Sequence, residues 1–192
     1  TNQRSMNRLL ALANGIVRFL ERIADWSGWL LIVLMCVTCV DVVVRKFGVP
    51  HFPYTKLQEL EWHLHTAIFS LWLGFNYTIN AHPRVDSYTE TLSFRTKAWV
   101  EFAGCLIFAL PYTLVIVYFG WDFVKHAYVF NEGSDAASGL GYRWFIKGVM
   151  YVGLWLLLLG IVSVLLRLIV YLFGNRTAEE VDLRIGNSAS AV

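Results

Sequence analysis

Four long apolar runs divide this chain, and most of its charged residues gather between them. Each run is about as long as the ~20 residues that a helix needs to cross the hydrocarbon core of a bilayer. Because unpaired backbone groups are costly in hydrocarbon, a single spanning segment of this length must be helical. The pattern therefore predicts an all-α membrane protein with four crossings, at about residues 26–47, 57–80, 98–121 and 142–173.

Composition supports this interpretation and excludes one class of partner. The 192 residues are 57% hydrophobic and 16% charged, which alone would also fit a very apolar soluble core. The bilayer-length spacing of the charges favours the membrane, with residues 26–173 as one four-helix domain in contact with lipids. A net charge of +2 is too small to indicate nucleic-acid binding.

The first 25 residues have a different pattern from the four runs. Apolar residues recur there at helical spacing, and the opposite face is basic, with Arg4, Arg8, Arg18 and Arg22. This predicts an amphipathic helix over residues 1–25. Such a helix either lies in the headgroup plane or extends the first crossing, and the periodicity fits both.

Charged side chains mark one end of the first two predicted crossings. Asp41 and Arg45 are four residues apart and would share a helix face, so they can pair near lipid. Glu59 and Glu61 fall in the first turns of the second crossing, where the helix dipole favours acids. We expect these four residues at one level, with a salt bridge from Arg45 to Glu61 joining the two helices. The alternative is independently solvated charges, since exposed pairs contribute little.

Polar or breaking residues predict features in the second half of the chain. His82, Arg84 and Asp86 would structure the loop after the second crossing, with Asp86 a candidate cap for the next helix. Pro111 predicts a kink in the third crossing. Arg167 near the end of the fourth is expected to extend to the headgroups, and residues 174–192 are expected to form a polar, mobile tail.

The distribution of Lys and Arg predicts the orientation. Four crossings place both termini on one side, and that side carries the larger number of Lys and Arg residues. The positive-inside rule then favours cytoplasmic termini. On this topology Glu59 and Glu61 lie at the outer face, and the loop with His82 faces the cytoplasm.

The sequence offers no arrangement of residues for catalysis. It contains no HExxH, no paired CxxC motifs and no phosphate-binding glycine loop, so we expect no enzyme activity, no metal and no cofactor. The five histidines raise the alternative of a haem- or quinone-binding anchor subunit of a redox enzyme. A membrane haem needs facing axial histidines, whereas His63 and His65 are two residues apart and point to different sides of one helix. A self-sufficient transporter is disfavoured because the charges lie near the ends of the crossings rather than at mid-depth.

Several short motifs, in order, resemble a known family. They are Asp41-Val42-Val43-Val44-Arg45-Lys46-Phe47, Glu59-Leu60-Glu61, Phe69-Ser70-Leu71-Trp72-Leu73-Gly74 and His82-Pro83-Arg84-Val85-Asp86. From about Trp26 to Phe173 the chain resembles the small, DctQ-type membrane subunit of tripartite ATP-independent periplasmic (TRAP) transporters. Spacing back from Gly74 favours Glu61 over Glu59 as the family's acidic position.

The resemblance implies a specific role. The chain would be a scaffold subunit in a bacterial inner membrane, without catalysis or cofactor. Its partner would be a large permease subunit that carries the sodium and substrate sites. A periplasmic binding protein would deliver the solute, an organic acid. The outer acidic residues and the loop at 122–142 would be candidates for contact with that binding protein.

Overall fold

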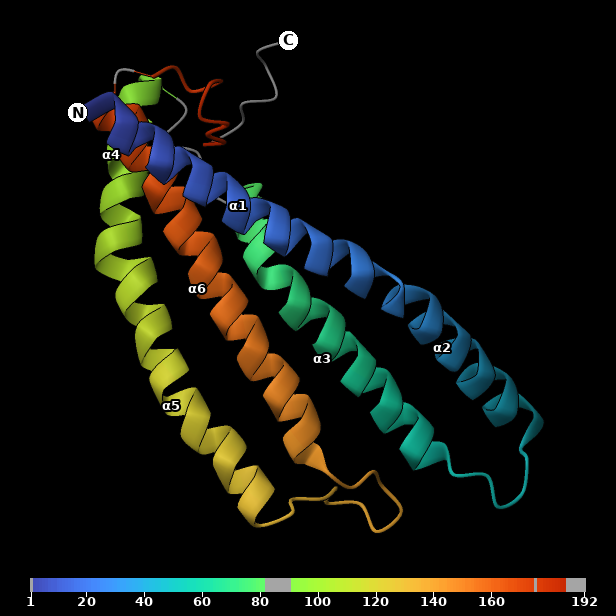
Figure 1. Ribbon diagram of the computed structural model, residues 1–192. Coiled ribbons are helices and arrows are strands. Elements are labelled where there is room, and N and C mark those ends of the chain that lie inside the picture. The colour runs from blue at the N-terminus through green and yellow to red at the C-terminus, as the bar shows by residue number, and fades with distance from the viewer. Residues whose placement is uncertain (1, 82–90, 175, 186–192) are drawn as a thin grey trace. The chain divides into compact units, whose positions relative to one another are not determined.

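Every regular element in the described part of the chain is helical, which confirms the all-α expectation. The computed structural model describes residues 2–81, 91–174 and 176–185. Its elements are α1 (Asn2–Gly28), α2 (Leu30–Phe47), α3 (Tyr54–Thr78), α4 (Phe94–Gly104), the π-helical segment η2 (Cys105–Ala109), α5 (Leu110–Val129) and α6 (Arg143–Phe173) (Figure 1).

The chain divides into two compact units, which are described separately. The first, here the terminal unit, takes Thr1–Glu21, Leu73–Val115 and Trp155–Val192. The second, here the loop unit, takes Arg22–Trp72 and Ile116–Leu154 and so contains the α2–α3 and α5–α6 connections.

Three helical stretches of the described residues are long and apolar enough to cross a membrane. They are Gln3–Phe47, Phe94–Val129 and Arg143–Phe173. The first has 45 residues, roughly twice the length that one crossing needs. α3 is long enough but carries Lys56, Glu59 and Glu61 in its first turns. The count of four crossings, and their bounds, therefore remain predictions.

The three stretches differ in how far the protein itself buries them. In the most apolar window of the stretch that contains α6, 56% of residues are buried, against 17% in each of the other two. Much of the apolar surface of α2 and α5 is exposed, including Met35, Val42, Tyr118 and Phe119. Water would penalise such surfaces, so they are suited to lipid or to another membrane chain.

In the terminal unit, the C-terminal segment packs onto α6 instead of projecting as a mobile tail. Leu183 and Ile185 are buried in one cluster with Ala98 of α4 and with Leu168 and Leu172 of α6. Apolar side chains placed in an otherwise polar segment give residues 176–185 a face that α6 can cover. The expectation of a mobile tail is therefore wrong for these residues.

Arg167 holds the C-terminal segment against α6. The expectation that it extends to the headgroups is wrong. Arg167 is only 5% exposed. Its guanidinium donates to the backbone and side-chain oxygens of Asp182, at 2.7 and 3.1 Å, and to Oδ1 of Asn14 in α1 at 3.0 Å. A buried charge needs such partners, and here they come from both chain ends.

Pro111 is accommodated by a change of helix type. The five residues of η2 precede it, and the N–H of Leu110 bonds to the carbonyl of Cys105 in the wider π pattern. Because proline lacks an N–H and its ring crowds the preceding turn, a local π segment relieves the conflict. The kink expected at this position stays a prediction.

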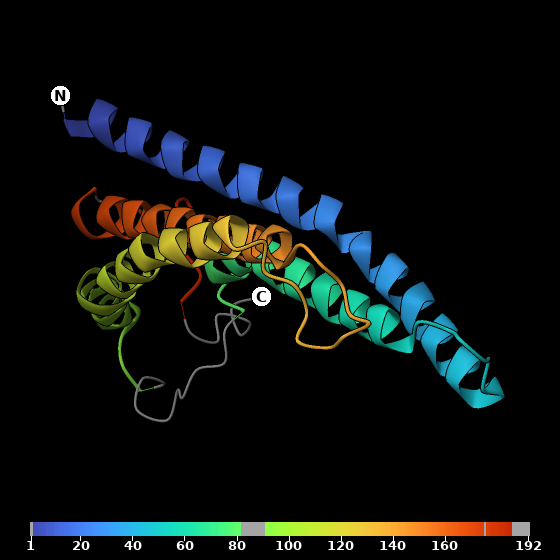
Figure 2. The same ribbon diagram turned by 90° about the horizontal axis from the view of Figure 1, so that it is seen from below.

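In the loop unit, α1 leads into α2 with only a one-residue break. Trp29 keeps helical dihedral angles, and Figure 2 shows α2 continuing from the end of α1. α2 ends at Gly48, whose φ of 60° is easy only for glycine. The Tyr54 hydroxyl then donates to the Val49 carbonyl at 2.9 Å, closing the turn that places α3 beside α2 (Figures 1 and 2).

Small residues let α3 and α6 approach closely in both units. In the loop unit, a Cβ on Gly153 would lie 2.5 Å from the carbonyl oxygen of the fully buried Ser70. In the terminal unit, a Cβ on Gly160 would lie 2.6 Å from the carbonyl oxygen of Gly74. Close backbone approach through small residues is a common way for helices to associate in membranes. The motif that ends at Gly74 is therefore a packing surface.

Candidate functional site

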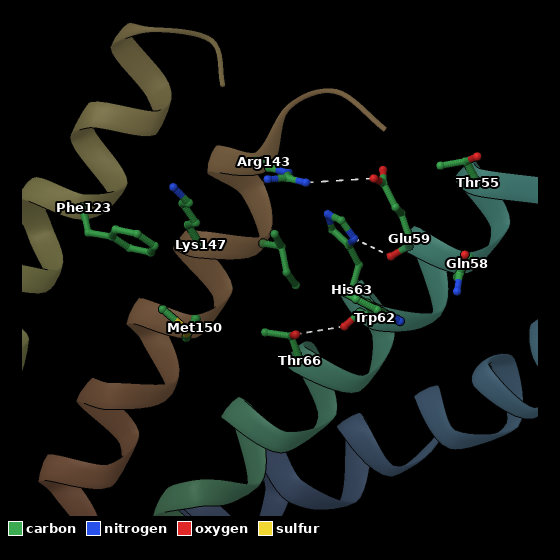
Figure 3. A pocket seen from close by; sticks show the side chains of 11 residues that line it. Thr55, Gln58, Glu59, Trp62, His63, Thr66, Phe123, Arg143, Lys147 and Met150 are labelled. Atoms are coloured by element: carbon green, nitrogen blue, oxygen red, sulfur yellow. Dashed lines mark hydrogen bonds and ion pairs between the residues drawn. The ribbon is translucent and has the colours of Figure 1, made fainter. Parts of the chain in front are cut away.

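The most organised polar region of the loop unit is the connection between α5 and α6, which Glu59 of α3 anchors. One carboxylate oxygen accepts the Ser134 hydroxyl hydrogen, and the other accepts the Leu140 N–H at 2.5 Å. Arg143, the first residue of α6, lies 3.9 Å from the same carboxylate (Figure 3). Hydrogen bonds to a charged acceptor are stronger than neutral ones, so this side chain holds the loop at two points.

The loop also closes on itself around Gly139. The Ser134 N–H donates to the Leu140 carbonyl at 3.0 Å, and the Ala136 N–H donates to the Ser134 hydroxyl at 3.1 Å. A Cβ on Gly139 would collide with the Ser134 side chain and lie 2.7 Å from a Glu59 oxygen. Only glycine therefore fits at this position while the anchor is in place.

A second ion pair attaches the start of the loop to α6. The Lys147 ammonium lies 2.5 Å from Glu132 and 4.0 Å above the Phe123 ring of α5. Its hydrogen bond holds the pKa of the Glu132 carboxyl below the ordinary value, although partial burial acts in the opposite direction. The Arg143 N–H also donates to the Glu132 backbone carbonyl at 2.9 Å, so the two ends of the loop are tied together.

A cavity of about 490 Å³ lies beside this anchored loop, between α3, α5 and α6. Glu59, Arg143 and Lys147 line it near the loop, and Trp62 and Met150 line it further along the helices (Figure 3). Its volume lies in the range of small-molecule sites.

The structure brings some of the predicted outer charges together. Arg45 donates to Asp41 at 2.6 Å, as their spacing predicts. Glu61 is near enough to act electrostatically on Arg45, but the ion pairs of the described residues do not include that pair, which stays a prediction. One oxygen of Asp41 and one of Glu61 are buried with no hydrogen-bond partner in the described chain. Glu59 does not join this group because it holds the loop instead.

The second predicted motif, His82, Arg84 and Asp86, lies outside the described residues. The next described helix, α4, has a different cap from the proposed Asp86. The Ser93 side chain accepts the Thr96 N–H at 3.3 Å.

The histidines of the loop unit make local contacts. The His63 ring nitrogen Nδ1 lies 2.5 Å from the Glu59 carbonyl, and His126 stacks against Phe130 at 4.4 Å. Among the described residues, no group of three His, Cys, Asp or Glu side chains could hold a metal ion.

Sequence reasoning missed the partners of Glu59. Ser134, Leu140 and Arg143 are 75 or more residues away along the chain, and no local periodicity connects them. The available signal was an acid in the first turns of a helix together with a loop rich in glycine and serine.

Comparison with known families identifies the chain. A match to the family described as tripartite ATP-independent periplasmic transporters, DctQ component, covers residues 34–170. The chain belongs to this family. Neither the comparison with curated proteins nor that with solved structures returned a match.

DctQ membership establishes the broad role. The protein is a multi-pass membrane component of a TRAP transporter, namely its small permease subunit, and not an enzyme. The family match does not favour the redox-anchor alternative. The matched range contains the α3–α6 packing surface, the anchored loop and the Asp41–Arg45 pair.

Proposed function

We propose that this DctQ subunit is a stationary scaffold for a large, sodium-coupled permease subunit that takes up an organic acid delivered by a periplasmic binding protein. It would reside in the bacterial inner membrane with both termini in the cytoplasm. The family match carries this proposal. The exposed apolar surfaces of α2 and α5 support it, because a membrane partner can cover them.

Within that role, the charged residues near the end of α2 would contact the large subunit. A buried carboxylate oxygen without a donor is unfavourable, and Asp41 and Glu61 each have one. Those two atoms are covered by the chain itself, whereas the Arg45 side chain is 44% exposed, and its remaining donors could meet an acceptor of the large subunit. Arg45, which is paired with Asp41, would orient that carboxylate and help to hold α2 against α3.

The anchored loop would have a different partner. On the predicted topology it lies on the periplasmic side, where its exposed Asp135 and the surrounding backbone could meet the binding protein. A loop fixed at Glu59 and Glu132 presents one conformation, which lowers the entropy cost of docking.

Co-purification of the assembled transporter tests the scaffold role. Arg45→Ala and Glu61→Ala should each reduce the amount of large subunit that co-purifies with the tagged chain, because each removes a group at the proposed contact. Glu59→Ala is the matched control, since it removes an acid two residues away that serves the loop. Retention of the large subunit by both variants at the level of the control would refute the contact.

A further inference from the structure

The cavity beside the anchored loop is polar at one end and apolar at the other. Along α6, Arg143 and Lys147 are one turn apart on the same face, and Met150 follows three residues later. These positions span roughly 10 Å along the helix axis. Across the cavity, Glu59 lies near the cationic end and Trp62 lies further along α3 (Figure 3). The cavity therefore suits a molecule with a charged head and an apolar body.

The polar end carries both signs, because Glu59 lines it together with Arg143 and Lys147, and its two cations keep hydrogen-bond donors available for an anion. A lysine ammonium has three donors and a guanidinium has five. Lys147 contacts Glu132 closely, but in the described chain that is its single ion-pair partner. Arg143 has only long contacts, 3.4 Å to Asp135 and 3.9 Å to Glu59. A phosphate placed between the two side chains would accept charge-assisted hydrogen bonds from both.

The depth of the cavity along the helices matches the headgroup level. α5 and α6 belong to candidate membrane spans, and the polar loop that joins them lies at the cationic end. Trp62, Tyr128 and Tyr142 are exposed in this part of the loop unit, with exposures of 65–69%. Exposed Trp and Tyr are typical of the membrane–water interface.

We propose that this cavity is a phospholipid-binding site. The phosphodiester lies between Lys147 and Arg143, and an acyl chain runs against Trp62, Ile146 and Met150. An apolar membrane helix of a partner subunit would offer no anion to Arg143 and Lys147, whereas a phospholipid supplies both a phosphate and an apolar chain. The inference requires only that the chain is embedded in a membrane, so it is independent of the solute and partners proposed above.

Native mass spectrometry of the full chain, released from nanodiscs of phosphatidylethanolamine and phosphatidylglycerol, tests the site. One phospholipid should remain bound to the wild type. Lys147→Gln should reduce this retention about tenfold, because it removes a charged donor. Lys147→Arg should preserve the retention. Lys125→Gln, which removes an exposed cation of α5 that does not line the cavity, is the matched control and should not change it.

A second variant separates lipid binding from folding of the loop. Met150→Trp fills the apolar end and leaves both cations in place, so it should also displace the lipid. Equal retention by Lys147→Gln, Met150→Trp and the control would overturn the proposal. Displacement of the lipid by soluble glycerol phosphate would also overturn the proposal, because it would indicate a simple anion site.

Crosslinking identifies the occupant in the assembled transporter. A photoreactive residue at position 150 should form an adduct with lipid. An adduct with a polypeptide partner instead would show that the cavity is a protein interface and would overturn the proposal.

Discussion

Removing the Glu59 carboxylate should release the α5–α6 loop. The carboxylate accepts two hydrogen bonds, from Ser134 and Leu140, and hydrogen bonds to charged groups contribute about 1.5–3 kcal/mol each. Arg143 at 3.9 Å is partly exposed, so screening limits its contribution to ~1 kcal/mol or less. Because the contributions are coupled, we expect Glu59→Ala to lower the free energy of loop opening by about 3 kcal/mol.

Amide hydrogen exchange of the full chain in nanodiscs measures this opening directly. A change of about 3 kcal/mol corresponds to roughly 100-fold faster exchange at Leu140 when the loop recloses faster than its open amides exchange. Glu59→Gln is the informative comparison. Its amide oxygen can still accept the Leu140 N–H and its NH₂ can donate to the Ser134 hydroxyl, so the increase should be about tenfold.

The effect of removing the Glu59 carboxylate should be local. Exchange of the α4 amides around Ala98, in the terminal unit, should not change in either variant. If Glu59→Ala left exchange of residues 133–140 at the wild-type rate, the carboxylate would not hold the loop, and the account of this site would be refuted.

Three further predictions follow from other contacts. Because the pKa of Glu132 is lowered, its ion pair with Lys147 stabilises the fold at pH values above the ordinary carboxyl pKa of ~4.3, and this stabilisation is lost as the pH falls through the lowered pKa. Lys147→Met should therefore remove this acid dependence from amide exchange of the loop, and an acid dependence that persisted in the variant would count against the pair. On α6, Gly153→Ala should lower the free energy of unfolding by about 1–3 kcal/mol, because the added Cβ would collide with Ser70 of α3. Gly148→Ala places its Cβ in open space and should leave the stability unchanged or slightly raised. Equal effects of the two variants in thermal unfolding would contradict the close packing of α3 against α6. Asp182→Ala removes the carboxylate that pairs with the buried Arg167 charge but keeps the backbone carbonyl at position 182 and the Asn14 contact, so it should cost about 1–3 kcal/mol in thermal unfolding. Arg167→Met removes the charge altogether and should cost less; the reverse order in the same assay would argue against a buried clamp.

The helical elements could be predicted because their signals are local. Apolar runs of bilayer length give helices, and α2 ends at Phe47 because Gly48 and the prolines after it cannot continue the helix. The Asp41–Arg45 pair was accessible for the same reason, since four-residue spacing fixes two side chains on one face.

The remaining features depend on contacts between distant segments, which periodicity does not encode. Glu59 was assigned to an ion-pair group with Arg45, but its partners lie in a loop 75 and more residues away. Arg167 was expected at the headgroups, but Asp182 and Asn14 offer acceptors that make burial favourable. The packing of the segment around Leu183 could not be predicted, because its few apolar residues form no helical pattern.

The central claim is that this DctQ subunit supports transport without performing it. Solute accumulation in proteoliposomes tests that claim most directly, with the purified chain alone and with the chain joined by its large permease subunit and binding protein. We predict sodium-dependent accumulation of an organic acid only in the complete system. Accumulation driven by the chain alone would contradict the account.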